Sequence, residues 1–289
     1  IPDSSMVGTV MVNLLSNIKA VAVNNLKVSI EFDPSTKIAN LDRQVSDINI
    51  TSWGVEINIG SIGYGQRRDF IVVLDKLVGN TLVSTTYRDH GSNDLNKLEK
   101  EIPARNLQIT LTEKEKLNFN EQITRITLVN SIHKILNYSK INEFSEAKMV
   151  IKNIQDFIDS KKTSPYLEDV KKDIEGQITQ SITREDWFKK WGIHYLPSLA
   201  KAHELQLTNN FKDPGVQSYG GNLFCDIRDE ADEIFVKLPA PKPSISVSRY
   251  GSNSHKPVNM SNFHNSNNPC FSGHCPVLMA DGSTKKVEQ

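Results

Sequence analysis

The chain has 289 residues, with 34 basic and 34 acidic side chains, so its net charge is zero. This balance argues against a general binder of nucleic acids or anionic membranes, because such proteins usually carry a basic excess. The length suggests about two domains, and no apolar run approaches the roughly 20 residues that cross a bilayer.

The two ends indicate that the chain is the middle part of a longer protein. Ile1–Ser5 lacks an initiator Met and the basic and apolar stretches of a signal peptide, and the last residues carry no closing signal. The three cysteines, Cys225, Cys270 and Cys275, are too few and too uneven for a disulfide framework. A reducing, cytoplasmic compartment is therefore expected.

Residues 1–22 are predicted to contain an amphipathic helix over 3–20. The apolar residues that define its face recur at spacings of three and four: Val7, Val10, Met11, Leu14, Leu15 and Ile18. A helix with such a stripe needs a sheet or another helix to cover it. No sheet precedes it in this sequence, which is a second reason to expect an upstream domain.

Residues 23–112 have the alternation and turn signals of short strands. The predicted strands are Leu26–Phe32, Val55–Ile59, Phe70–Leu74, Leu82–Tyr87 and Leu107–Leu111. Phe70–Leu74 is apolar throughout, as in a core strand, and Gly60, Gly63 and Gly65 are placed between strands. Many short strands separated by turns predict an antiparallel β-sandwich.

Residues 113–238 are predicted to be helical. Four amphipathic segments with short connections over 117–205 predict a small bundle. Ser164-Pro165 is the preferred start of the third segment, and Pro197 is expected to kink or restart the fourth. Residues 206–238 are interpreted as polar loop with a short helix.

The last 51 residues consist of a polar segment, 239–268, followed by a segment with strand and turn signals, 269–289. Residues 239–268 are rich in Pro, Ser and Asn with few large apolar side chains, so we expect a disordered linker. Val277-Leu278-Met279 then predicts a strand, Ala280–Ser283 a turn containing Asp-Gly, and Thr284–Val287 a returning strand.

The segment from Cys270 resembles the opening of a hedgehog/intein (Hint) domain. Cys270-Phe271-Ser272-Gly273, followed by Cys275, Val277 and the predicted hairpin, is similar to the Cys-Phe-x-Gly start, strand and turn of such domains. The resemblance implies that residues 269–289 are the start of a Hint domain.

The rest of the chain resembles von Willebrand A/hedgehog-intein-like (Vwaint) proteins. Pro2–Thr9 looks like the last helix of their von Willebrand A-type (VWA) domain. Asn58–Gly60, Tyr64–Asp69, Leu196–His203 and Asn209–Gln217 are similar to their connecting region. The resemblance implies an α+β chain: the last VWA helix, a β-sandwich, a helical domain, a linker and the first Hint hairpin.

In a Hint domain, the thiol of Cys270 would attack the carbonyl carbon of Pro269. The peptide bond would become a thioester, which a second nucleophile then resolves. Donors for the oxyanion and a His that protonates the departing nitrogen are also needed. The family's Thr-x-x-His segment and its C-terminal His-Asn pair would lie downstream of residue 289, so the chain by itself is expected to be inactive. Pro269 replaces the Gly of hedgehog proteins, and its hindered carbonyl is expected to slow the step.

Other readings of these residues stay open. Cys270 can be an ordinary thiol between linker and strand, Cys275 a small strand residue, and Cys225 a small buried hydrophobe. A zinc site at Cys270, His274 and Cys275, with His264 nearby, lacks a matching second pair of ligands. No metal or cofactor is therefore expected.

Three further features are interpreted as structural rather than functional. Trp187, Trp191 and Tyr195, at four-residue spacing, are expected in a core, and the acidic run 229–233 on a solvated helix face. The histidines at 133, 194 and 203 are scattered, and no nucleophile or paired carboxylate is evident near them in the sequence.

Two functional classes follow from the sequence. The protein is either a self-processing precursor whose residues 23–238 connect and present a VWA domain, or a non-enzymatic interaction scaffold, for example one that recruits substrates for ubiquitination. In both cases the expected partners are other proteins, bound through the VWA and β-sandwich/helical regions, and not nucleic acid or a membrane.

Overall fold

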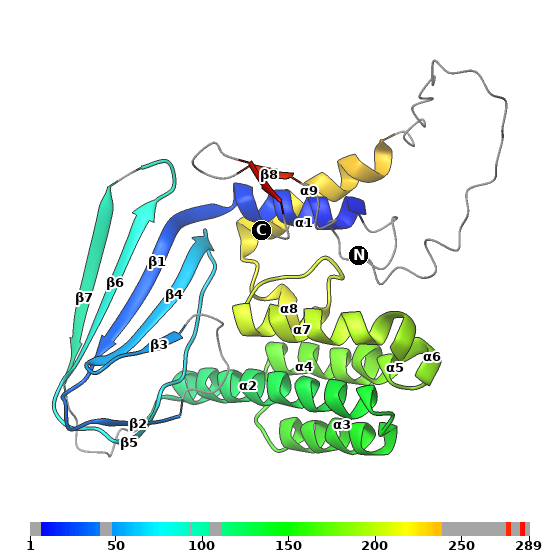
Figure 1. Cartoon of the computed structure of the whole chain (residues 1–289), viewed down its shortest axis with the longest axis horizontal. Coiled ribbons are helices and arrows are strands. Elements are labelled where there is room, and N and C mark those ends of the chain that lie inside the picture. Colours follow the sequence, from blue (N-terminus) through cyan, green and yellow to red (C-terminus); the bar gives the residue numbers. More distant parts are fainter. Residues whose placement is uncertain are drawn as a thin grey trace. The chain divides into compact units, whose positions relative to one another are not determined.

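The computed structural model describes residues 7–40, 48–92, 94–103, 111–238, 276–278 and 284–286. The chain divides into two units, Ile1–Leu238 and Pro239–Gln289, and each is described by itself. The first unit combines an antiparallel sheet with several helices (Figure 1). The prediction of an α+β chain is confirmed at this level.

The described strands of the first unit form two sheets. They are β1 (Val21–Glu31), β2 (Lys37–Asn40), β3 (Ile48–Ile50), β4 (Gly54–Gly63), β5 (Val73–Lys76), β6 (Thr81–Asp89) and β7 (Leu95–Ile102). One sheet has the order β3-β4-β1-β6-β7, and β2 pairs with β5 in the other. All these pairs are antiparallel. The two-layer form of the predicted β-sandwich stays a prediction.

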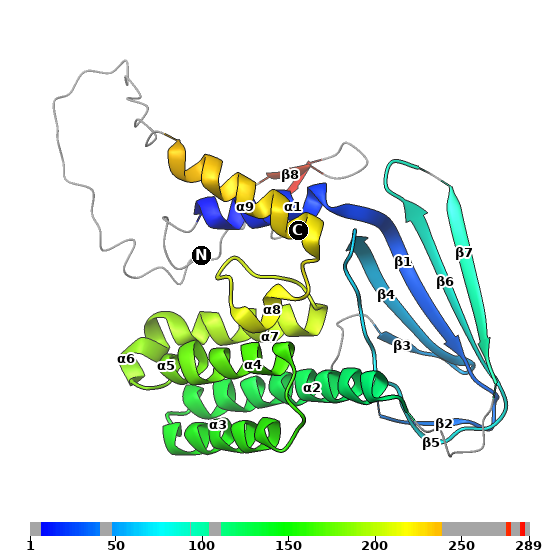
Figure 2. The ribbon, with the colours of Figure 1, turned by 180° about the vertical axis from the view of Figure 1, so that it is seen from behind.

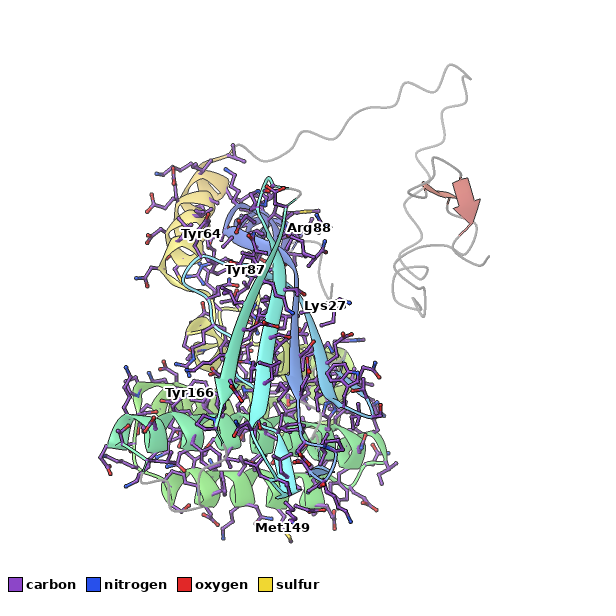
Figure 3. All side chains as sticks on the ribbon, turned by 90° about the vertical axis from the view of Figure 1, so that its left-hand side faces the viewer. Lys27, Tyr64, Tyr87, Arg88, Met149 and Tyr166 are labelled. Carbon is purple, nitrogen blue, oxygen red and sulfur yellow. The ribbon has the colours of Figure 1, made fainter. Side chains whose placement is uncertain are left out.

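Strand β1 is the centre of the larger sheet. Its residue Val28 lies opposite Ile57 of β4 on one side and Thr85 of β6 on the other. Figure 3 looks onto these neighbouring strands, with Lys27 labelled on β1 and Arg88 on β6. Few of the sheet's large apolar side chains are buried, namely Leu26, Val55 and Ile57. The sheet therefore contributes little to the core.

The helices of the first unit are α1 (Val7–Lys19), α2 (Glu113–Lys140), α3 (Phe144–Asp159), α4 (Pro165–Asp173), α5 (Thr179–Ser181), α6 (Glu185–Trp187), α7 (Ile193–Leu205), α8 (Pro214–Gln217) and α9 (Asn222–Lys237). Two π-helical turns, η2 (Ile174–Ile178) and η3 (Phe188–Gly192), interrupt the series. Helix α2 packs against both α3 and α7. The main core lies here, around fully buried residues such as Ile132, Ile154, Val170, Leu196 and Leu199.

The starts of two of these helices follow from the sequence. Thr112 and Glu115 form a capping box before α2, in which each side chain bonds the other's backbone N–H. Ser164 caps α4 by accepting a hydrogen bond from the Leu167 N–H, and Pro165 follows as the first helical residue. The predicted start at Ser164-Pro165 is confirmed.

Some strand predictions were wrong. Of Phe70–Leu74 only the last two residues enter a strand, because the backbone of Asp69, directly before this run, bonds to the helices instead of to the sheet. Gly60 and Gly63 lie within β4 and not between strands. Strand β7 was missed because its sequence, LNKLEKEI, is largely charged and exposed. Leu107–Leu111 falls mostly outside the described residues.

The helical predictions also needed correction. Helix α7 continues through Pro197 without a break, and the departure from α-helical geometry occurs earlier, in η3. The expected short helix after residue 206 is in fact α9, with 16 residues. Its start at Asn222 follows the glycines Gly220 and Gly221.

Helix α1 packs against α9 with small residues beside its predicted apolar stripe and not with the stripe itself. Its apolar stripe is exposed, with Met11, Leu14, Leu15 and Ile18 each at least half accessible. The buried face carries Val12 and Ser16, and it lies against α9. A Cβ on Gly8 would lie 1.9 Å from the ring of Phe235, so a larger residue at this position would have to displace that ring.

The second unit contains a short pair of strands, β8 (Pro276–Leu278) and β9 (Thr284–Lys286). They pair antiparallel, with Val277 opposite Lys285. They lie where the sequence predicts two strands, while the turn between them and residues 239–275 lie outside the described residues. In the described part of the chain, no helix is long and apolar enough to cross a membrane.

The buried core of the helices predicts a large effect of Ile132→Ala. Ile132 is 0% exposed in α2, so its truncation removes apolar burial and leaves a cavity. The free energy of unfolding is expected to fall by about 2–5 kcal/mol, measured by denaturant titration. The matched control Ile141→Ala, at a residue 64% exposed, is expected to change it by less than about 0.5 kcal/mol. Equal effects of the two variants would contradict this core.

Candidate functional site at the junction of sheet and helices

A short segment joins the sheet to the helices. Residues 64–70, here called the strap, follow β4 and run to the helical part before β5 begins (Figure 1). Gln66 connects its two sides: the Gly63 N–H donates to Gln66 Oε1 over 3.0 Å, and Gln66 Nε2 donates to the Gly220 carbonyl over 3.1 Å. The end of β4 is thereby tied to the loop before α9.

Asp69 and Gln206 form a second connection. The Asp69 N–H donates to Gln206 Oε1, and Gln206 Nε2 donates to the Asp69 carbonyl, both over 2.9 Å. Gln206 ends α7 in the left-handed conformation, with a φ of 52°, a position that usually favours glycine. Its side chain explains why a glutamine is used there: the amide replaces the sheet partner that Asp69 lacks.

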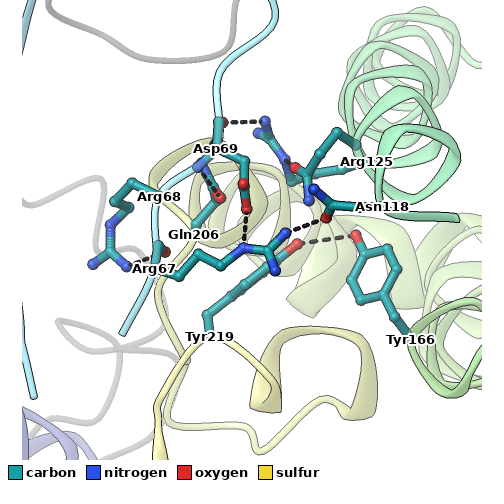
Figure 4. Close-up of polar contacts among 9 residues, drawn as sticks. Arg67, Arg68, Asp69, Asn118, Arg125, Tyr166, Gln206 and Tyr219 are labelled. Atoms are coloured by element: carbon teal, nitrogen blue, oxygen red, sulfur yellow. Dashed lines mark hydrogen bonds and ion pairs between the residues drawn. The ribbon is translucent and has the colours of Figure 1, made fainter. Parts of the chain in front are cut away.

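Arg125 of α2 is the centre of the junction (Figure 4). It is only 1% exposed, and its guanidinium donates to the carbonyls of Asp69, at 3.0 Å, and His203, at 3.2 Å, and to Gln122 Oε1, at 2.8 Å. Strap, α2 and α7 thus meet on one buried side chain. All three acceptors are uncharged, so the geometry depends on hydrogen bonds and not on an ion pair.

The strap itself contains two arginines, Arg67 and Arg68, which differ in their hydrogen-bond partners. Arg67 bonds Asp69 Oδ2 over 2.7 Å and also Asn118, but it is exposed. Arg68 donates to the Arg67 carbonyl and to Gln66 Oε1, and no carboxylate pairs with it in the described part of the chain. Burial lowers the pKa of Arg68 to about 10, which leaves it charged at neutral pH.

Two tyrosines and a histidine form a buried chain of hydrogen bonds next to Arg125. The Tyr219 hydroxyl lies 2.9 Å from the Tyr166 hydroxyl and 3.0 Å from His203 Nδ1. Burial, and secondarily the charge of Arg125, lower the pKa of His203 to about 3, so His203 is neutral. Burial also raises the pKa of both tyrosines, so neither supplies a phenolate.

A pocket of about 210 Å³ opens beside these hydrogen-bonded tyrosines. Its lining includes Arg67 and Asp69 of the strap, Glu121 of α2, and Tyr166 and Tyr219. Tyr64 stands at the far end of the strap, beside the start of α9 (Figure 3). Polar and charged side chains line the pocket. Among the described residues that line it, no nucleophile is paired with a base.

A second buried polar cluster lies in the helices. The Gly215 N–H donates to Asp173 Oδ2 over 2.8 Å, and the Tyr195 hydroxyl donates to Asp213 Oδ1 over 3.1 Å. Asn209 also bonds Asp213, through both its amide nitrogen and its oxygen. A Cβ on Gly215 would lie 2.5 Å from Asp173 Oδ2, so the close approach requires glycine. The cluster fixes α8 against α4 and α7.

The two carboxyl groups of this cluster share a buried site, and no cationic side chain among the described residues bonds to either. Asp173 is 2% and Asp213 1% exposed. Burial, and secondarily the charge of Asp213, raise the pKa of Asp173 to about 7. Burial also raises the pKa of Asp213. Asp173 therefore carries a proton for part of the time at neutral pH.

The predicted nucleophile is not tested by these residues. Cys270 and its target Pro269 lie outside the described residues, as do Cys275, His264 and His274. Cys225 is a free thiol on α9 and is partly exposed, so the expectation of a buried hydrophobe was wrong; the buried face of α9 carries Phe224 and Arg228 instead. No group of three or more His, Cys, Asp or Glu in the described part of the chain can hold a metal.

The histidines and aromatic residues gave mixed outcomes. His133, for which the sequence indicated no paired carboxylate, lies 3.1 Å from a carboxylate oxygen of Glu204. Tyr195 is buried and contacts the ring of Trp191, as a core stripe predicts, whereas Trp187 is 36% exposed. In the acidic run, Asp229, Glu230 and Glu233 are exposed on α9, as predicted.

The carboxyl cluster and the buried tyrosines lie in the part of the chain that a comparison with known families recognises. Residues 164–233 match the family model Vwaint, described as VWA / Hh protein intein-like. The match confirms, over this Vwaint segment, the family that the sequence resembles. Neither the search of curated proteins nor the search of solved structures found a match.

The junction extends beyond the Vwaint segment. His203, Gln206 and Tyr219 lie inside it, while the strap and Arg125 lie outside it. The residues that hold the strap therefore come from both the matched and the unmatched part of the chain. Sequence reasoning missed Arg125 and Asp173, since each is one charged residue in an otherwise ordinary helix.

The anchoring role of Arg125 predicts a local effect of Arg125→Met. The loss of its bonds to the carbonyls of Asp69 and His203 should release the strap. Backbone amides of residues 64–70 are then expected to exchange hydrogen faster, measured by hydrogen–deuterium exchange with mass spectrometry. Arg67→Met, which removes an exposed contact, is the control and should leave exchange unchanged. Equal exchange in both variants would contradict the role of Arg125.

The raised pKa of Asp173 predicts that stability falls as pH rises. The folded state binds this proton more tightly than the unfolded chain, so the stabilisation present below the ordinary pKa of 3.8 is lost as pH passes through about 7. The melting temperature of the wild type should fall between about pH 5 and pH 8, because Asp173 loses its proton in this range. Asp173→Asn should flatten this fall, and Asp226→Asn, at an exposed carboxylate on α9, should not. An unchanged slope in Asp173→Asn would contradict the assignment.

Proposed function

We propose that the chain is the connecting and presenting region of a VWA–Hint protein, and that it carries the first residues of the self-processing domain. The family match over residues 164–233 is the observation that carries this proposal, because its description names both VWA and intein-like proteins. In the protein as a whole, this region would hold the VWA domain on one side and lead into the Hint domain on the other.

The exposed stripe of α1 supports placing a VWA domain before the sheet. Val7, Met11, Leu14, Leu15 and Ile18 are 41–55% exposed and occupy one helix face. No charged residue occurs between Val7 and Ile18. A helix with so much exposed apolar surface is typical of one that belongs to a larger core. On this proposal residues 1–22 are the closing helix of the VWA domain.

The connection between α1 and the sheet supports the presenting role. Only Ala20 separates α1 from β1, and Ala20 is 0% exposed. Its N–H donates to the Ser16 carbonyl, and its carbonyl accepts from the Tyr64 N–H over 2.8 Å. A domain built on α1 would therefore have one orientation relative to the sheet.

The chemistry proposed for the intact protein is an N-to-S acyl shift at Cys270. Its sulfur bonds to the carbonyl carbon of Pro269, the C–N bond between the two residues breaks, and the released nitrogen takes a proton. The product is a thioester, which water or another nucleophile then cleaves. The reaction is self-cleavage at most, and it is not assigned to residues 1–289 alone.

Intact-mass analysis of the whole protein tests the proposal. Wild type and Cys270→Ala are compared with and without added thiol, with Cys275→Ala as the matched control. Cleavage between Pro269 and Cys270 is expected in the wild type and in Cys275→Ala, and is expected to be lost in Cys270→Ala. An unbroken chain in all three variants would overturn the self-processing part.

An interaction scaffold without enzymatic activity is the second candidate. Exposed apolar side chains on the outer strands of the larger sheet favour it: Ile50 of β3 is 60% exposed, and Leu95 and Leu98 of β7 are 64% and 61% exposed. Such residues on edge strands offer contact sites to other proteins. An unbroken wild-type chain together with a partner that no longer binds Leu98→Asp would favour this function.

A further inference from the structure

The end of helix α9 is unusually apolar for an exposed segment. Ile234 is 54%, Phe235 43%, Val236 82% and Leu238 58% exposed. The preceding part of the helix is acidic and solvated, so the exposed apolar turn contrasts with the rest of the helix. Exposed apolar surface of this extent marks a contact with another protein surface.

This apolar turn lies next to the first turn of α1. The ring of Phe235 packs directly over Gly8. The two helices run antiparallel, and the end of α9 lies beside the start of α1 in both opposite views (Figures 1 and 2). Val7 and Met11 flank Gly8 on α1 and belong to its exposed stripe. The stripe and the last turn of α9 therefore form one continuous surface, here called the two-helix surface.

We propose that the last turn of α9 docks on the VWA domain that covers the stripe of α1, so that one domain occupies the whole two-helix surface. This inference rests on the proposed function. The occupant is chosen by continuity: a domain that includes α1 is already held where α9 ends, and binding it there costs little additional ordering. The domain that covers the uncharged stripe must offer an apolar face, and the same face can cover the apolar last turn of α9.

The inference adds a role for α9 to the proposed function. The chain that leads to Cys270 leaves the first unit at Leu238, directly after this turn. Docking of the turn would fix the starting point of that segment beside the VWA domain. The VWA domain would then contact both ends of the region that presents it.

Site-specific photo-cross-linking in the intact protein tests the inference. p-Benzoylphenylalanine replaces Val236, and in separate variants Leu15 of α1 or Leu98 of β7. Val236 is expected to cross-link within the same chain to residues that precede Val7, with a yield well above that of Leu98. Leu15 should cross-link to the same domain.

The outcomes separate the inference from the proposed function. Cross-linking from Leu15 but not from Val236 overturns the docking of α9 and leaves the proposed function standing. If neither Leu15 nor Val236 cross-links to residues that precede Val7, both the docking of α9 and the proposed function are overturned. A cross-link from Val236 to a second copy of the chain, seen as a dimer on denaturing gels, replaces the VWA domain by self-association and overturns the inference.

Discussion

The structure depends on one buried guanidinium. Arg125 bonds the carbonyls of Asp69 and His203 and thereby fixes the strap of the sheet to two helices. A buried charge is costly unless its hydrogen bonds are satisfied, and here the acceptors are backbone carbonyls and an amide. The sheet buries few large apolar side chains, so these polar contacts are its principal attachment to the core of the helices.

The strap contacts give the region its geometry. Through Ala20 and Tyr64 the end of β4 holds the junction of α1 with β1, and through Gln66 and Gln206 the same strap holds the start of α9 and the end of α7. Helices α1 and α9, which come from opposite ends of the first unit, therefore lie side by side. This fixed arrangement fits the proposed function of a region that connects two neighbouring domains, a proposal carried by the family match over 164–233.

The sequence predicted those features that depend on local patterns. The start of α4 at Ser164-Pro165 and the amphipathic segments that became α2 and α3 follow from residue type and spacing, and the structure contains them. Phe70–Leu74 was misread because an apolar run does not reveal that Asp69 bonds to Gln206, 137 residues away. The stripe of α1 was correctly identified, but its spacing alone gave no indication that the packing face would be the small residues around Gly8.

The candidate site was less predictable than the fold. His203 and Asp213 stood in segments that resemble the connecting region, but nothing in the sequence indicated that Tyr166 and Tyr219 would join His203 or that Asp173 would approach Asp213. Each of these contacts joins residues from different helices, and the sequence carries no periodic signal for them. The resemblance at Cys270 concerns residues that the structure does not describe, so it stays a prediction.

Because the strap contacts join the sheet to the helices, the two parts of the first unit are expected to unfold as one cooperative body. The chain has three tryptophans, Trp53 in the turn before β4 and Trp187 and Trp191 in the helices, which allows each part to be followed separately. Denaturant unfolding is measured by fluorescence in one variant that retains only Trp53 (Trp187→Phe and Trp191→Phe) and in another that lacks it (Trp53→Phe). Coincident transitions are predicted. A sheet that unfolds at lower denaturant than the helices would contradict the account.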